Sequence, residues 1–199
     1  MNDDTAKFYD KFYSYYPLLN IFLKPYKKRL FQEINKWESG KLLEIGVGDG
    51  SHFHLYETHD IIGIDTSVNM LERARGKIKG SMELYQMSGE DLRFESNTFD
   101  YIVLCHVISV VDNPERLLAE CNRVLKQNGQ IIILNHFTPK NWLRYIDKSF
   151  QFLSNFFKFK SLFYLESLKT LSQFSLVSNI SPSKLSYFRI LIYAKRTTK

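Results

Sequence analysis

The stretch LLEIGVGDG, residues 42–50, decides how the rest of this chain can fold. It starts as a short, mostly apolar run, which is typical of a buried strand. Glycines then stand at Gly46, Gly48 and Gly50, where a backbone without side chains can come close to a bound molecule. We therefore predict a buried strand that ends in a ligand-binding loop.

The spacing of these glycines narrows the class of ligand. The loop reads G-x-G-x-G and is followed by Ser51, whereas the dinucleotide fingerprint reads G-x-G-x-x-G. This difference disfavours NAD and FAD. A phosphate-binding P-loop is excluded, because no Gly-Lys-Ser or Gly-Lys-Thr follows the glycines.

Asp65 is the second residue that points to a ligand. It ends the next apolar run, IIGID (61–65), and an acidic residue at that place can accept hydrogen bonds from ribose hydroxyls. The alternative is that Asp65 caps the helix expected after it. Because Thr66 or Ser67 could form that cap, we favour ribose binding.

Strand and helix patterns alternate on both sides of these two signals. The expected strands cover residues 41–46, 61–65, 83–87, 99–105 and 130–134, followed by a pair at 175–181 and 186–195. The expected helices of this region cover residues 51–57, 68–78 and 114–125. This alternation predicts an α/β fold with a mostly parallel sheet and helices on both faces.

Two flanking segments differ from this central region. Residues 5–37 predict two helices broken near Pro17 and Pro25, because proline removes a helix hydrogen bond. Residues 138–173 are helical in pattern and rich in aromatic side chains. We expect both segments to cover one edge of the sheet.

Composition excludes several classes of protein. Hydrophobic residues make up 44% and charged residues 24% of the 199 residues, which is typical of one globular domain rather than a disordered chain. The net charge of +6 is compatible with an anionic partner, or it could serve only to keep the protein soluble. Cys105 and Cys121 lack metal-ligand spacing, so we expect no metal site. Since the sequence shows no signal peptide and no spanning apolar run, we expect a cytoplasmic protein.

The chain resembles class I S-adenosylmethionine-dependent methyltransferases. The matching pieces are LLEIGVGDGSHF (42–53), IIGIDTSVNMLERAR (61–75), GEDLRF (89–94), FDYIVLCHVIS (99–109) and PERLLAECNRVLKQNGQIIILNHF (114–137). More narrowly, HVISVVDNPERLL, the closing NHF and the N-terminal YDKFYSYYP look like bacterial phospholipid N-methyltransferases. Those enzymes methylate phosphatidylethanolamine.

The resemblance implies a Rossmann-like sheet of about seven strands with an antiparallel hairpin at its end. We expect a single domain over residues 1–199. Its expected parts are an N-terminal helical cap (1–38), a cofactor-binding core (39–137), a helical lid (138–175) and a C-terminal hairpin (176–199).

The resemblance also implies how S-adenosylmethionine binds. The glycine loop would hold the methionine part and the ribose, and Glu44 would orient this loop near the cofactor's amino group. Asp65 would accept hydrogen bonds from the ribose hydroxyls, and Met70 would pack near the adenine. The implied cofactor-binding residues are Tyr9, Glu44, Gly46, Gly48, Gly50, Asp65, Thr66, Met70, Gly89, Glu90, Asp91 and His106.

The adenine end departs from the family pattern. Gly89, Glu90 and Asp91 would sit by the amino edge of the adenine. Many relatives carry Gly-Asp before the residue that matches Gly89, whereas this chain has Met87-Ser88. We therefore expect Ser88 or Glu90 to make the contact that the missing acid makes in those relatives.

Methyl transfer from a sulfonium is an in-line displacement, so the protein mainly positions the two reactants. An amine acceptor must arrive neutral, and a general base can assist. The candidate residues for positioning or proton transfer are His106, His136 and Tyr16. For His106 the alternative is packing beneath the loop. Tyr9 and Tyr16 match two tyrosines of the family's N-terminal segment, although Pro17 stands where the family commonly has Asp.

The favoured acceptor is phosphatidylethanolamine, and the alternatives are a soluble metabolite or a cofactor-binding module without catalysis. Nucleic acid is not an expected partner, because CHVI (105–108) lacks the Asn/Asp-Pro-Pro-aromatic motif of many amino-methylating nucleic-acid enzymes.

Basic residues alternate with bulky apolar ones at 24–29 and 140–160. This pattern predicts contact with an anionic membrane surface at the inner face of the membrane, or a lid over the site. We expect a monomer.

Overall fold

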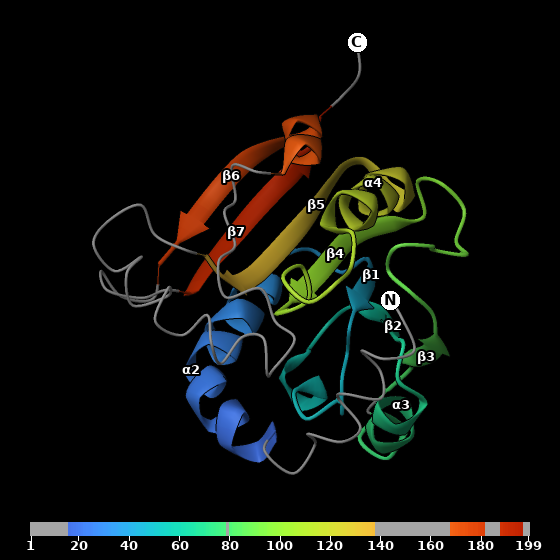
Figure 1. The fold of residues 1–199 in the computed structure, drawn as a ribbon, viewed down its shortest axis with the longest axis vertical. Coiled ribbons are helices and arrows are strands. Elements are labelled where there is room, and N and C mark those ends of the chain that lie inside the picture. The colour runs from blue at the N-terminus through green and yellow to red at the C-terminus, as the bar shows by residue number, and fades with distance from the viewer. Residues whose placement is uncertain (1–15, 79, 138–167, 182–187, 197–199) are drawn as a thin grey trace.

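The computed structural model describes residues 16–78, 80–137, 168–181 and 188–196, with side chains from residue 23 onward (Figure 1). The predictions for Tyr9, for residues 138–167 of the helical lid (138–175) and for membrane contact at residues 140–160 lie outside the described residues. The same holds for the side chain of Tyr16, the residue at which the first described helix begins.

A seven-stranded sheet forms the centre of the molecule, with the strand order β3-β2-β1-β4-β5-β7-β6. Its strands are β1 (Lys41–Ile45), β2 (Asp60–Asp65), β3 (Glu83–Gln86), β4 (Phe99–Cys105), β5 (Leu125–His136), β6 (Phe174–Ile180) and β7 (Phe188–Lys195). Strands β1 to β5 pair in parallel, and β7 is antiparallel to both β5 and β6. The predicted Rossmann-like sheet with a closing antiparallel hairpin is confirmed.

Helices cover both faces of this sheet (Figure 1). One face carries α4 (Pro114–Val124) and the short 3₁₀ helix η4 (Lys169–Gln173). The other carries α2 (Tyr16–Ile34), α3 (Val68–Arg75) and the 3₁₀ turn η2 (Phe53–Leu55). No helix of the described residues is long and apolar enough to cross a membrane.

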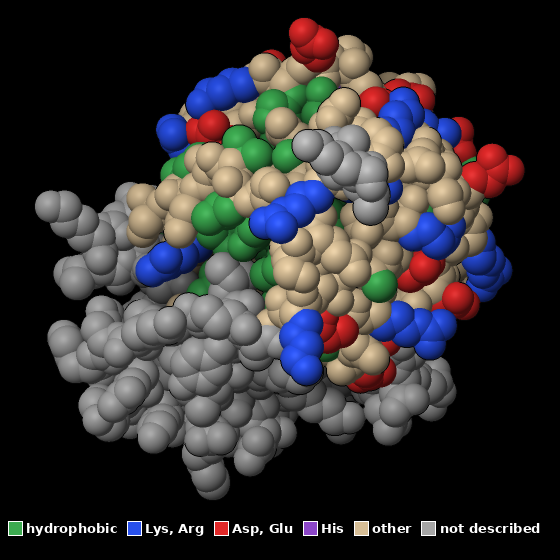
Figure 2. Space-filling model, turned by 90° about the horizontal axis from the view of Figure 1, so that it is seen from above, with side chains coloured by type: hydrophobic (Ala, Val, Ile, Leu, Met, Phe, Trp, Pro, Cys, Tyr) green, Lys and Arg blue, Asp and Glu red, His purple; other side chains and the backbone are tan. Residues whose placement is uncertain are grey.

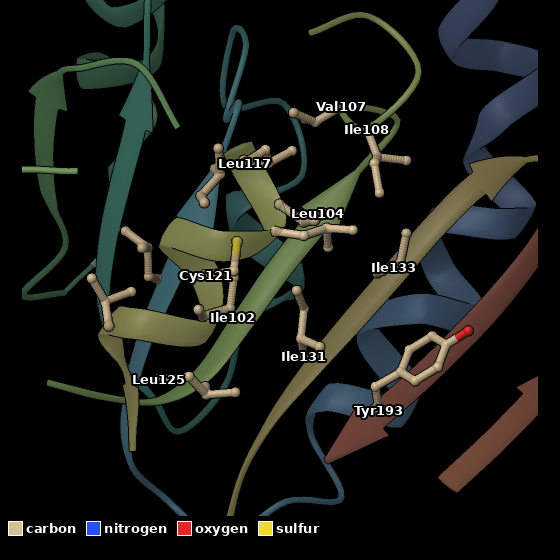
Figure 3. Packing of buried hydrophobic residues seen from close by; sticks show 14 of the residues in the cluster. Ile102, Leu104, Val107, Ile108, Leu117, Cys121, Leu125, Ile131, Ile133 and Tyr193 are labelled. Carbon is tan, nitrogen blue, oxygen red and sulfur yellow. The ribbon is translucent and has the colours of Figure 1, made fainter. Parts of the chain in front are cut away.

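Helix α4 shows how local sequence and packing together place the site. Asn113 begins it by accepting a hydrogen bond from the Arg116 backbone N–H at 3.0 Å, and proline occupies its first turn. Leu117 and Cys121 then pack on Ile102 and Leu104 of β4 (Figure 3). Full burial of a leucine side chain contributes about 1.5–3 kcal/mol. This packing holds β4, and therefore the residues that follow it, in a fixed position.

Three predicted element boundaries are wrong. Pro25 lies inside the continuous helix α2 and does not break it. Pro25 is exposed, so water can satisfy the freed carbonyl, while buried Leu30 and Phe31 anchor the following turns. The expected helix 51–57 is only the turn η2, and the fifth strand begins five residues earlier than the predicted 130, at Leu125. This early start includes a register irregularity between β4 and β5.

Charged side chains are mixed on the face shown in Figure 2. Lysine and arginine lie among aspartate and glutamate there, so the described part of this face carries no large field of one sign (Figure 2).

Candidate active site

The glycine loop after β1 turns sharply over the edge of the sheet. Its backbone is tied to β2, because the Gly46 and Val47 N–H groups both donate to the Ile64 carbonyl, at 2.7 and 3.1 Å. Gly46 has a φ of +76°, and a Cβ placed there would lie 2.4 Å from Val107 Cγ2. Only glycine therefore allows the loop to lie this close to the segment after β4.

Asp65 is clamped at the end of β2. Its Oδ2 accepts a hydrogen bond from the Gly48 N–H at 2.8 Å, and its Oδ1 accepts one from the Ser67 N–H at 2.9 Å. Burial raises the pKa of Asp65, and backbone hydrogen bonds from Ser67, Gly48 and Thr66 partly offset that rise. The cap of α3 is Ser67, whose hydroxyl accepts from the Met70 N–H at 3.2 Å, so the cap does not need Asp65.

A cavity of about 740 Å³, part of it open to solvent, lies between this loop and the ends of β2 and β4. The predicted residues that line it are Gly46, Gly48, Asp65, Thr66, Met70, Gly89 and His106. Seven of the twelve implied cofactor residues thus share one cavity wall. Cys105, Val107 and Val110 line the same cavity and were not predicted there. Their apolar character gave no signal that distinguishes them from core residues.

The acidic candidates at the adenine end lie apart from this wall. Glu90 Oε1 accepts hydrogen bonds from the Asp112 and Asn113 N–H groups, at 3.0 and 3.3 Å. The Asp91 side chain is 77% exposed and lies 3.7 Å from an arginine. Ser88 does line the cavity, so of the two expected replacements for the missing acid Ser88 is the one in the cavity wall.

Glu44 is fully buried beneath the loop rather than in the cavity wall. Its Oε2 accepts a hydrogen bond from the Tyr56 hydroxyl at 3.0 Å, and its Oε1 lies 2.7 Å from His52 Nε2. Neither partner was predicted from the sequence. A histidine and a tyrosine four residues apart carry no distinctive motif.

His106 follows β4 in a left-handed conformation, with a φ of +61°. The backbone N–H of His106 donates to the Leu134 carbonyl at 2.7 Å. The imidazole ring packs edge-on against the Phe188 ring, with 5.4 Å between the ring centroids. His136 lies 6.0 Å from the same Phe188 ring, so the fold brings the two predicted histidines together. Burial, then the charges of Lys27 and His136, lower the pKa of His106 to about 3. The imidazole is therefore neutral at physiological pH.

Helix α2 places a cation near this end of the cavity. Lys27 shares a helix face with buried Leu30, Phe31 and Ile34, because residues three, four and seven apart align. The preceding Tyr26 packs against Phe188 at a ring distance of 4.7 Å. The positive charge of Lys27 acts to lower the pKa of both Cys105 and His106. The other cations of this helix, Lys24, Lys28 and Arg29, are exposed.

The described residues contain no group of three or more histidine, cysteine, aspartate or glutamate side chains that could hold a metal ion. The described residues at the cavity offer a carboxylate at the loop, a neutral imidazole, a nearby ammonium and an apolar wall.

Comparison with known proteins gives concordant matches. A family model described as a methyltransferase domain matches residues 43–133. The chain is 32% identical over 177 residues to a phosphatidylethanolamine N-methyltransferase of Cereibacter sphaeroides, covering 85% of this chain and 87% of the relative. It is 29% identical over 157 residues to a demethylmenaquinone methyltransferase of Thermotoga maritima, covering 74% and 68%.

A solved structure from Thermotoga maritima is described as an S-adenosylmethionine-dependent methyltransferase, possible histamine N-methyltransferase. It superposes with a TM-score of 0.70 at 23% identity, covering 96% of this chain and 99% of the other. At this identity the likeness concerns the fold.

Proposed function

This chain belongs to the class I S-adenosylmethionine-dependent methyltransferases, and we propose that its acceptor is the amine of phosphatidylethanolamine or a related phospholipid. The observation that carries the proposal is the 32% identity to a phosphatidylethanolamine N-methyltransferase across 87% of that relative.

The cavity fits the cofactor of this family. The Asp65 carboxylate accepts backbone hydrogen bonds from Gly48, Ser67 and Thr66, and its two oxygens have about four acceptor sites, so it can still accept from a ribose hydroxyl. The side chains of Met70 and Val111 offer an apolar wall for a flat base, and the Ser88 hydroxyl lies in the same wall. When bound, S-adenosylmethionine supplies an activated methyl group on its sulfonium.

The residues of this chain act on the acceptor by positioning it. His106 Nε2 is buried and has no hydrogen-bond partner among the described residues. We assign it a hydrogen bond with the acceptor amine, which would orient the nitrogen for in-line attack. Because the pKa of His106 is near 3, this imidazole does not store the proton that the amine releases.

Lys27 supports an acceptor that carries both an amine and a phosphate. A positive charge near the site disfavours the protonated ammonium form of the amine. The same charge attracts the phosphodiester of a phospholipid headgroup. Both effects favour a neutral, correctly placed nucleophile.

A second candidate acceptor is a quinol ring carbon. The observation that favours it is the similarity to demethylmenaquinone methyltransferases, one of which shares 29% identity over 157 residues. Such an acceptor has neither an amine nor a phosphate, so the positive charge of Lys27 does not help to bind or activate it.

The test is methyl transfer from labelled S-adenosylmethionine to phosphatidylethanolamine vesicles, with and without phosphatidylglycerol. Asp65→Ala is the control that lacks the ribose contact. Labelled lipid with the wild-type chain, and none with the variant, supports the proposal. When demethylmenaquinol is offered beside the vesicles, labelled menaquinol without labelled lipid overturns it. Stimulation by phosphatidylglycerol supports contact with an anionic membrane.

Two lysines give a matched pair for the phosphate contact. Lys27→Met should raise the KM for phosphatidylethanolamine about tenfold, which corresponds to one charge-assisted hydrogen bond. Lys28→Met removes the same charge from the exposed side of α2 and should change the KM little at 0.15 M salt. Equal effects of the two variants would show a general surface charge effect and no phosphate contact.

A further inference from the structure

A buried polar contact joins the two ends of the cofactor loop. Glu44 precedes the loop and His52 follows it. The carboxylate Oε1 lies 2.7 Å from the ring Nε2, a close electrostatic contact whose angle is not that of a hydrogen bond. The Tyr56 hydroxyl donates to the other carboxylate oxygen at 3.0 Å. Glu44 is 0% and His52 only 6% exposed, so water does not screen this contact.

Aromatic packing fixes the His52 ring in place. Phe31 of α2 stacks on it at 5.2 Å with an interplanar angle of 25°, and Phe53 packs on it edge-on at 5.2 Å. Phe31 also meets the Tyr56 ring edge-on at 4.7 Å. Since the partners of Glu44 are held by the helix that covers this face, the carboxylate has one well-defined position.

The loop is held at two further points, but by different kinds of contact. Asp65 accepts from the Gly48 N–H at its middle. Lys77 donates to the Asp49 carboxylate and carbonyl on its outer side, at 2.7 and 2.8 Å, with a side chain that is 40% exposed. An exposed ion pair contributes little, whereas a buried carboxylate that loses a partner is strongly destabilised.

We propose that His52 and Tyr56 are positioning residues, which hold the glycine loop in its cofactor-binding shape through the buried Glu44 carboxylate. Burial and Glu44 raise the pKa of Tyr56 well above its usual value, so its hydroxyl stays protonated and donates. The inference concerns cofactor binding and does not depend on which acceptor is methylated.

The test measures S-adenosylhomocysteine binding by calorimetry in the full-length protein. His52→Phe keeps an aromatic ring of similar size and removes the nitrogen, while His52→Gln keeps an N–H donor. We expect about tenfold weaker binding for His52→Phe and recovery of most of this loss in His52→Gln. Lys77→Met is the control for an exposed loop contact and should change the dissociation constant less than twofold.

Two further measurements separate positioning from general stability. Tyr56→Phe removes a single oxygen and keeps the packing, so it should fold and still weaken binding. Adding His52→Phe to a Glu44→Gln background should cause no further loss, because the effect acts through Glu44. Unchanged binding in both His52→Phe and Tyr56→Phe would overturn the proposal. An additive loss in the double variant, or no recovery with glutamine, would also overturn it.

Discussion

Replacing Gly46 by alanine should cost more stability than the same replacement at Gly80. Both glycines have a positive φ, +76° and +70°, so each alanine carries the left-handed strain of about 1–2 kcal/mol. At Gly46 the new Cβ would also lie 2.4 Å from Val107 Cγ2, whereas at Gly80 no described heavy atom lies within 4 Å. Overpacking of this kind costs about 1–3 kcal/mol. We therefore expect losses of about 2–5 kcal/mol for Gly46→Ala and about 1–2 kcal/mol for Gly80→Ala.

Urea unfolding of the two variants measures this difference, and a cycle with Val107→Ala identifies its cause. Because Val107→Ala removes the clashing methyl group, the double variant should be more stable than additivity predicts, by about 1–3 kcal/mol. Gly46 and Val107 both line the cavity, so S-adenosylhomocysteine binding should weaken in Gly46→Ala and not in Gly80→Ala. Equal stability losses in the two glycine variants, or strict additivity in the cycle, would refute the steric argument.

Three other predictions concern single side chains. Asp65→Asn should weaken S-adenosylhomocysteine binding by about 10- to 100-fold. Since burial raises the pKa of Asp65 and only the ionised form accepts from both hydroxyls, wild-type affinity should fall as pH drops, starting at a higher pH than for an ordinary aspartate; calorimetry across pH measures this. The pH profile of kcat/KM should show no limb from His106 above about pH 4, because its pKa is about 3; a limb near neutral pH that disappears in His106→Asn would contradict this. Glu115→Ala removes the carboxylate that accepts from the Lys169 and Thr170 N–H groups, at 2.6 and 2.8 Å, and should lower the free energy of unfolding by about 1 kcal/mol after screening. These contacts lower the pKa of Glu115, so the stabilisation is present above its unfolded pKa and is lost as pH falls through the folded value, which urea unfolding at several pH values would show.

Parts of the fold that depend on short stretches of sequence were predictable. The apolar run before Gly46 forms β1. Asp65, the acid expected at the end of the next strand, accepts a hydrogen bond from the Gly48 N–H of the loop at 2.8 Å. The strand 99–105 and the start of α4 at Pro114 were also predicted at their observed positions. In each case the signal is an apolar period or a cap, which acts within a few residues.

Other features depended on partners far along the chain. Pro25 was expected to break a helix, but the buried face of α2 keeps the helix continuous. The Glu90 carboxylate accepts hydrogen bonds from backbone N–H groups 22 and 23 residues later, a contact that the local sequence does not predict, and its expected place at the adenine edge stays a prediction. The role of His52 was not predicted at all, because its partner Glu44 lies across the loop.

The class of fold and the glycine loop could be predicted from the amino-acid sequence, because strand and helix periods, glycine spacing and an acid at a strand end are local properties. Which side chains of distant segments meet at the site became visible in the folded molecule alone. Val107 packs against Gly46. The charges of Lys27 and His136 both lower the pKa of His106. The physical reason is that steric contact and the loss of water around a charged group depend on every atom nearby in space, and most of those atoms come from elements far apart in the chain.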